Sequence, residues 1–170
     1  PDQAVLDFWK GKTVNLIVPH GAGGGYDTYA RLIAPLIEKQ LGCTIVVVND
    51  TGAGGEVGRN KVYSSKGDGL TLGFPRGSAM VFSQASGSEG VQYDITKIKW
   101  MARALAEPSV LVAPAKGKYT TPESVIKSTS KLSFSVSGVG DDDFFTLGIV
   151  AAALKIQLNP VTGYNGTKEA

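Results

Sequence analysis

The chain has 170 residues, of which 42% are hydrophobic and 19% are charged, and its formal net charge is +2. This length allows a substantial core in one or two domains. The near-balanced charge, without a cluster of lysine and arginine, argues against nucleic acid as a partner, and no apolar run approaches the roughly 20 residues that span a bilayer. The single cysteine, Cys43, excludes an internal disulfide. No secretory leader is recognisable, so we expect a cytosolic protein or a mature form without its leader.

In the first half, strand, glycine-rich turn and helix alternate. Apolar, β-branched runs predict strands over 14–19, 44–48 and 70–74, and helices are predicted over 26–41 and 56–65. Pro35 lies inside the first helix, where we expect a kink or a late helix start. The alternation predicts a parallel sheet with right-handed crossovers, in which ligands bind beyond the carboxyl ends of the strands.

The second half begins with 100–106 and 110–113, which we expect to be two strands crossing between lobes. Thr121 and Pro122 are typical of a helix start. A strand is predicted over 132–136, a helix over 141–156 and a strand over 160–164. Because the chain stops at 167–170, in what should be the first turn of another helix, we expect it to be truncated.

Three of the predicted turns are rich in glycine. They contain Gly21, Gly23, Gly24 and Gly25; Gly52, Gly54, Gly55 and Gly58; and Gly138 and Gly140. Glycine permits positive φ and close approach of a ligand to the backbone, and the following helix start offers unpaired N–H groups and partial positive charge. A tight turn explains any one of these segments equally well, but three in one chain favour a binding role.

A nucleotide site and an enzyme are the alternatives. Asp50 is well placed as the acid of a dinucleotide fingerprint, but the third glycine position is occupied by Tyr26 or Val57, and no P-loop is present. Cys43 and His20 are the only cysteine and histidine, so no His/Cys metal cluster can form. Gly-x-Ser-x-Gly is also absent. We expect His20 to line the mouth of a pocket or to lie in a solvated loop, and we expect no catalytic residue, metal or cofactor.

Several motifs in order resemble a known family. They are 18–27 with 30–32, 48–55, 67–72, 93–94, 137–140 and 163–166. Together they look like the signatures of the periplasmic substrate-binding proteins of tripartite tricarboxylate transporters, the Bug receptors. The resemblance implies an α/β fold of the type II periplasmic-binding-protein kind, with two lobes, mainly parallel sheets and an incomplete C-terminus. Lobe one would span 1–103 and lobe two, in part, 104–170.

The resemblance also implies a function. The lobes would close on a small organic acid or related metabolite, without catalysis, cofactor, nucleic acid or membrane insertion, and the full-length receptor would deliver it from the periplasm to a membrane permease. The implied ligand-binding residues are Gly24, Gly25, Tyr26, Asp27, Ala53, Gly54, Gly55, Ser137, Gly138, Val139, Gly140 and Tyr164, and His20 is added to them as the candidate at the pocket mouth.

Two features depart from the family pattern. Asp141, Asp142 and Asp143 follow the third glycine turn, where we expect acids stabilised by the helix dipole; a sharper hypothesis is that one of them, such as Asp141, meets an ammonium or polar group of the ligand. Arg76 and Ser78 follow the third strand. Both are further candidate ligand-binding residues: Arg76 could pair with a ligand carboxylate, although we expect an exposed surface arginine.

Overall fold

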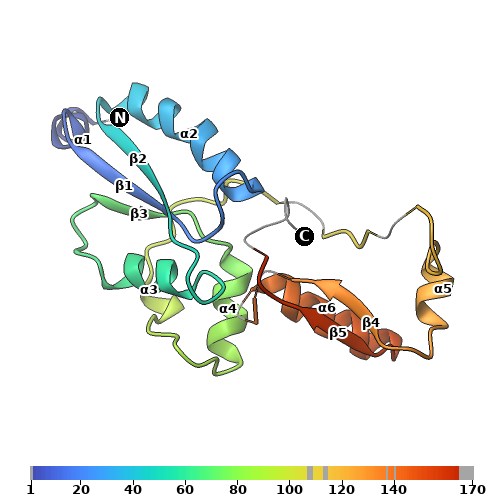
Figure 1. The fold of residues 1–170 in the computed structure, drawn as a ribbon. Coiled ribbons are helices and arrows are strands. Elements are labelled where there is room, and N and C mark those ends of the chain that lie inside the picture. Colours follow the sequence, from blue (N-terminus) through green and yellow to red (C-terminus); the bar gives the residue numbers. More distant parts are fainter. Residues whose placement is uncertain (1, 107–108, 113–114, 137, 140, 165–170) are drawn as a thin grey trace.

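The computed structural model describes residues 2–106, 109–112, 115–136, 138–139 and 141–164. This part of the chain is organised around two parallel sheets (Figure 1). We call the part built on the three-stranded sheet lobe one, and the part built on the two-stranded sheet lobe two. The predicted α/β class with parallel sheets is confirmed.

Lobe one has the strands β1 (Thr13–Val18), β2 (Thr44–Asn49) and β3 (Thr71–Gly73). β1 is central and pairs in parallel with both neighbours, with Thr13 opposite Thr44 and Asn15 opposite Thr71. The helices α2 (Gly25–Leu41) and α3 (Glu56–Ser64) cover the sheet from opposite sides (Figure 1). Because the three strands are parallel, they end at the same edge of the sheet, and the first two glycine turns follow β1 and β2 there.

The core of lobe one lies between this sheet and α2. Its buried members are Val14, Leu16, Val18, Ala30, Ala34, Cys43 and Ile45. Alanines on the inner face let the helix approach the β-branched strands closely. The expected late start of the helix is wrong: α2 begins at Gly25 and continues through Pro35 to Leu41, because one missing backbone bond does not end a helix of 17 residues. Gly42 ends it in the left-handed region, with φ of 67°.

Three short elements of lobe one were not predicted. They are α1 (Gln3–Trp9), α4 (Gly77–Ala85) and the 3₁₀ helix η1 (Ile95–Lys97). α4 follows β3 and packs against α6 (Asp142–Leu154) of lobe two, and Figure 1 shows the two helices side by side. α4 therefore forms part of the junction between the lobes.

The segment after η1 connects the lobes. The predicted strands over 100–106 and 110–113 are wrong for the residues that the structure describes there, which form neither strand nor helix. The apolar, β-branched composition favoured strands, but a strand also needs a hydrogen-bonded neighbour, and the described residues between Lys97 and Thr121 make no backbone hydrogen bond with one another or with either sheet. Met101 and Val112 accordingly remain exposed.

Lobe two begins with α5 (Pro122–Ile126), whose start has the predicted cap: Thr121 accepts from the backbone N–H of Ser124 in a capping box. β4 (Leu132–Ser135), α6 (Asp142–Leu154) and β5 (Leu158–Val161) follow. β4 and β5 pair in parallel, with Leu132 opposite Leu158. The last strand therefore starts before the predicted residue 160 and ends at Val161 rather than at 164. Among the described helices of both lobes, none combines the length and apolarity of a membrane span.

Candidate ligand-binding site

A cavity of about 170 Å³ lies beyond the carboxyl ends of β1 and β2, where lobe two meets lobe one. Lobe one lines it with residues from the turns after both strands, and lobe two lines it with residues from the start of α6 and from the segment after β5. The lining residues are Pro19, His20, Thr51, Gly54, Gly55, Asp141, Gly163 and Tyr164. This is the edge at which parallel α/β sheets bind ligands.

The second glycine turn has an unusual backbone. Ala53, Gly54 and Gly55 follow one another at φ of 52°, 64° and 91°, in the left-handed region. A Cβ atom on Gly55 would lie 2.5 Å from the carbonyl oxygen of Pro19, so glycine is required for space as well as for conformation. A Cβ on Gly138 of lobe two would lie 3.0 Å from the Cα of Gly54. Glycines therefore allow this turn to touch both the first turn and lobe two.

The first glycine turn is held by Asp27. The buried Asp27 carboxylate accepts hydrogen bonds from the backbone N–H of Gly23 (2.7 Å), from Asn49 Nδ2 (3.0 Å) and from Arg31 Nε (3.0 Å). Burial raises the pKa of Asp27, but the hydrogen bonds from Arg31, Gly23 and Asn49 outweigh this effect and hold the pKa below its ordinary value. Asp27 thus fixes the turn and does not line the cavity.

His20 forms one wall of the cavity. Its side chain is only 9% exposed, so the solvated position that we allowed for it is wrong and the pocket position is the observed one. The imidazole stacks on Tyr26, with ring centroids 4.4 Å apart, and its Nδ1 lies 3.9 Å from Asp141 Oδ2. Its Nε2 has no hydrogen-bond partner in the described part of the chain.

Burial lowers the pKa of His20 to about 4, because it penalises the imidazolium form. The nearby Asp141 carboxylate raises the pKa, while Arg76 and Arg59 lower it further. His20 is therefore neutral at pH 7, with one nitrogen as a donor and the other as an acceptor.

A buried ion pair between Arg59 and Glu56 contacts the cavity lining at Gly54. Arg59, only 1% exposed, places Nη1 2.8 Å from Glu56 Oε1 and donates from Nη2 to the carbonyl of Gly54 at 3.1 Å. The hydroxyl of Tyr93 donates to the same Glu56 oxygen at 3.1 Å. Burial and the Glu56 carboxylate raise the pKa of Tyr93 to about 12. Sequence reasoning missed this group, although acid and base three residues apart in a helix that follows a glycine turn were the signal for it.

The acids at the start of α6 meet cations of lobe one. Asp141 is 1% exposed and caps the helix by accepting from the backbone N–H of Asp142 at 2.9 Å. Its Oδ1 lies 3.7 Å from Arg59 Nη2 and 3.8 Å from Arg76 Nη1. Asp142 forms an ion pair with Arg76 and accepts from Ser78 Oγ at 2.8 Å. The expected helix-start acids are present, and they also join the lobes.

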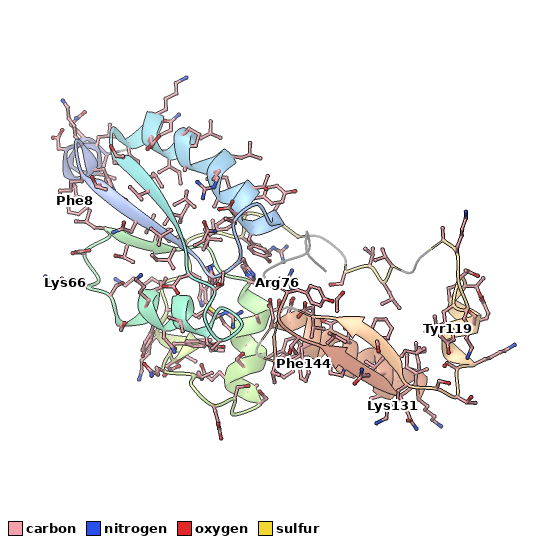
Figure 2. The ribbon with its side chains drawn as sticks, in the orientation of Figure 1. Phe8, Lys66, Arg76, Tyr119, Lys131 and Phe144 are labelled. Carbon is pink, nitrogen blue, oxygen red and sulfur yellow. The ribbon has the colours of Figure 1, made fainter. Side chains whose placement is uncertain are left out.

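Arg76 lies at this junction (Figure 2). Its side chain is 26% exposed, so the expected exposed surface arginine is wrong. It pairs with a carboxylate of the protein itself, that of Asp142, because the chain folds lobe two back onto the turn after β3. Arg76 Nε also donates to the hydroxyl of Tyr26 at 3.1 Å, which links the start of α2 to the turn after β3.

An aromatic contact completes the junction beside these charges. Phe82 of α4 stacks on Phe145 of α6, with ring centroids 5.3 Å apart. The carboxylates of Asp141, Asp142 and Asp143 each offer an oxygen within 4.8 Å of one another. Since Arg76 already lies beside two of these acids, the arrangement does not favour a metal ion.

The structure brings together only some of the predicted site residues. Those that line the cavity are His20, Gly54, Gly55, Asp141 and Tyr164. Those that contact its wall or the lobe junction are Tyr26, Arg76, Ser78 and Gly138. Those that do not line it are Gly24, Gly25, Asp27, Ala53 and Val139, of which Val139 is exposed. Ser137 and Gly140 lie outside the described residues. Sequence reasoning missed Pro19, Thr51 and Gly163 as lining residues.

Comparison with known proteins gives a family match. The family model described as "Tripartite tricarboxylate transporter family receptor" matches residues 29–170. A relative from Pseudomonas sp. (strain P51), the UPF0065 protein in the tcbD-tcbE intergenic region, is 28% identical over 169 residues, which cover 97% of this chain and 50% of the relative. Protein BugT of Bordetella pertussis (strain Tohama I) is 27% identical over 139 residues, covering 79% of this chain and 43% of BugT.

Solved structures give the same fold. The periplasmic binding protein BugD superposes with a TM-score of 0.66 at 24% identity, covering 94% of this chain and 54% of BugD. R. palustris Rpa4515 with adipate gives 0.65 at 19% identity, covering 94% and 55%. MatC from Rhodopseudomonas palustris with bound malate gives 0.64 at 22% identity, covering 92% and 54%. The chain spans about half the length of the relatives and structures that it matches.

Proposed function

The chain belongs to the tripartite tricarboxylate transporter receptor family, and on that premise we propose that it captures a small carboxylate-containing metabolite in the cavity between its lobes. The family is one of transporter receptors and not of enzymes. It therefore decides between our two interpretations of the glycine turns, in favour of a receptor and against a nucleotide-dependent enzyme. Asp50, the acid of the nucleotide alternative, pairs instead with Lys61 at 3.3 Å.

The observation that carries this proposal is the meeting of four segments around one cavity. The turns after β1 and β2 supply backbone from lobe one, and the start of α6 with the segment after β5 closes the cavity from lobe two. The glycine backbone of the second turn and the start of α3, which directly follows the lining residue Gly55, favour an anion on the lobe-one side of the cavity, because helix starts carry partial positive charge. Contacts from both lobes let ligand binding favour the closed arrangement.

The ligand class follows from the relatives. Because structures of the same fold are described with adipate and with malate, we propose a small organic acid for this chain. We also propose that the chain acts in the periplasm and passes its ligand to a membrane permease of the transporter. The boundary between the lobes near residue 103 fits this scheme, since the segment after η1 crosses from one sheet to the other without joining either.

Thermal denaturation tests the capture. The chain is heated with adipate, malate and other organic acids and, separately, with NAD and ATP. A ligand at a hundred times its dissociation constant stabilises a protein by about 2.7 kcal/mol, so an acid that binds should raise the melting temperature measurably. Stabilisation by nucleotides alone would overturn the proposal, and so would the absence of any shift with the acids.

A matched pair of variants locates the site. Thr51→Phe places a ring at the cavity lining and should abolish the shift with the organic acids. Thr120→Phe makes the same change at an exposed position in the connecting segment and should leave the shift intact. An equal shift in both variants would place ligand binding outside this cavity.

A further inference from the structure

We propose that the ligand of this cavity carries a hydrogen-bond donor beside its carboxylate, most favourably an ammonium group, and that His20 and Asp141 accept that donor. The inference rests on the proposed capture and concerns only the kind of ligand captured. It makes the His20–Asp141 wall the part of the cavity that determines specificity.

The first argument is the hydrogen-bonding state of His20. Asp141 Oδ2 lies 3.9 Å from Nδ1, and a carboxylate facing this nitrogen favours the neutral tautomer with its proton there. Nε2 is then an acceptor. This atom is buried, belongs to a cavity-lining side chain and has no hydrogen-bond partner in the described part of the chain. Because a buried acceptor without a partner is costly, a ligand N–H or O–H at this position would satisfy it.

The second argument is the charge around the cavity. The ion pairs at the junction join two guanidinium groups, of Arg59 and Arg76, to three carboxylates, of Glu56, Asp141 and Asp142. The pKa of His20, lowered to about 4, means that this side chain adds no positive charge at pH 7. A second ligand carboxylate beside Asp141 would increase the excess of negative charge, whereas an ammonium group would balance it.

The third argument is the burial of Asp141. This carboxylate is 1% exposed and lines the cavity. It lies 3.7–3.9 Å from nitrogen atoms of Arg59, Arg76 and His20, and these contacts are longer than ordinary hydrogen bonds. Interactions in such a buried place are weakly screened. A ligand ammonium within hydrogen-bond distance would therefore interact with it strongly.

Isothermal titration calorimetry with acids of matched length tests the inference. Glutarate has two carboxylates, 4-aminobutyrate has an ammonium group in place of one of them, and glutamate adds an ammonium group to both. We expect at least one of the two amino compounds to bind at least tenfold more tightly than glutarate. Equal or tighter binding of glutarate than of both would overturn the inference and leave the proposed capture standing.

Variants of the wall provide the second readout. Asp141→Asn keeps a good helix-capping side chain but removes the charge. It should reduce the preference for the amino compounds over glutarate to less than about threefold. Loss of the whole fold would not mimic this effect, because it would abolish binding of all three compounds. His20→Phe keeps a ring against Tyr26 without the acceptor and should weaken the amino compounds more than glutarate. Asp143→Asn, in the same first turn of α6, should keep the full preference. An unchanged preference in both wall variants would overturn the inference, whereas no binding of any acid to the unaltered chain would refute the capture itself.

Discussion

Replacing His20 with asparagine should flatten the pH dependence of stability between pH 6.5 and about 4. The imidazole is buried beside Tyr26, and this burial lowers the pKa of His20 from 6.5 to about 4. Asparagine has a similar polar head and does not titrate in this range, so the variant isolates the contribution of the imidazole.

The sign and size follow from proton linkage. Above pH 6.5 His20 is neutral in the folded and the unfolded chain. As the pH falls from 6.5 to about 4, the unfolded chain binds a proton that the folded chain does not, so the free energy of unfolding decreases. Below about pH 4 both states are protonated and the decrease stops. At 1.36 kcal/mol per pKa unit, the residue should destabilise the unaltered chain by roughly 2.5 kcal/mol between pH 7.5 and 4.5.

Urea denaturation followed by tryptophan fluorescence measures this effect. Trp9 and Trp100 both precede lobe two, so their fluorescence reports on the unfolding of lobe one, which contains His20. The difference in free energy of unfolding between the unaltered chain and His20→Asn should change by that amount across the range. Asp94→Asn is the control: hydrogen bonds from Thr96 lower the pKa of this partly exposed carboxyl, so its effect should stay constant above pH 4.5. Equal slopes for the unaltered chain and His20→Asn would show that the imidazole is solvated and refute its burial.

Two further predictions concern the glycine turn and the junction. Gly55→Ala puts a Cβ 2.5 Å from the carbonyl oxygen of Pro19 at a φ of 91°, and it should lower the free energy of unfolding in urea by at least about 2 kcal/mol. The control Gly25→Ala, with open space around its Cβ, should change this free energy by less than about 1 kcal/mol. Equal costs for the two variants would contradict the turn geometry. A double-mutant cycle of Arg76→Ala and Asp142→Ala should give a coupling of about 1 kcal/mol for this partly exposed pair, and a coupling of zero would mean that it does not join the lobes.

Much of lobe one could be predicted because its signals are local. The β-branched runs that became β1 and β2 and the helical spacing of apolar residues in α2 are properties of short segments. Glycine turns between them predicted the crossovers and the edge at which the cavity lies. Thr121 and Pro122 likewise marked the start of α5 correctly, since a capping box involves only neighbouring residues.

The failures have a different physical origin. The segments 100–106 and 110–113 have the composition of strands, but strand formation depends on a partner far away in the sequence. α4 was missed because Gly77 and Ser78 at its start are poor helix formers and its cap position, Arg76, makes no side-chain capping bond. Its apolar face is fixed by the contact with α6, which no local pattern contains.

The candidate site likewise combines features that are visible in short segments with contacts between residues far apart in the sequence. The glycine turns and His20 were recognisable as candidates, because backbone freedom and a single titratable ring are visible in the sequence. The pairing of Arg76 with Asp142 joins residues separated by 66 positions, and composition alone makes such an arginine look like a surface residue. Arg59 with Glu56 was the predictable part that was overlooked, since the two residues lie one helical turn apart.

The central claim is that the lobes bind an organic acid between them, and a crystal structure grown with the acid that gives the largest thermal shift tests it most directly. The account predicts electron density for that acid within the cavity lined by Gly54, Gly55 and Asp141. Density for the acid elsewhere on the chain, with only water in this cavity, would contradict the claim.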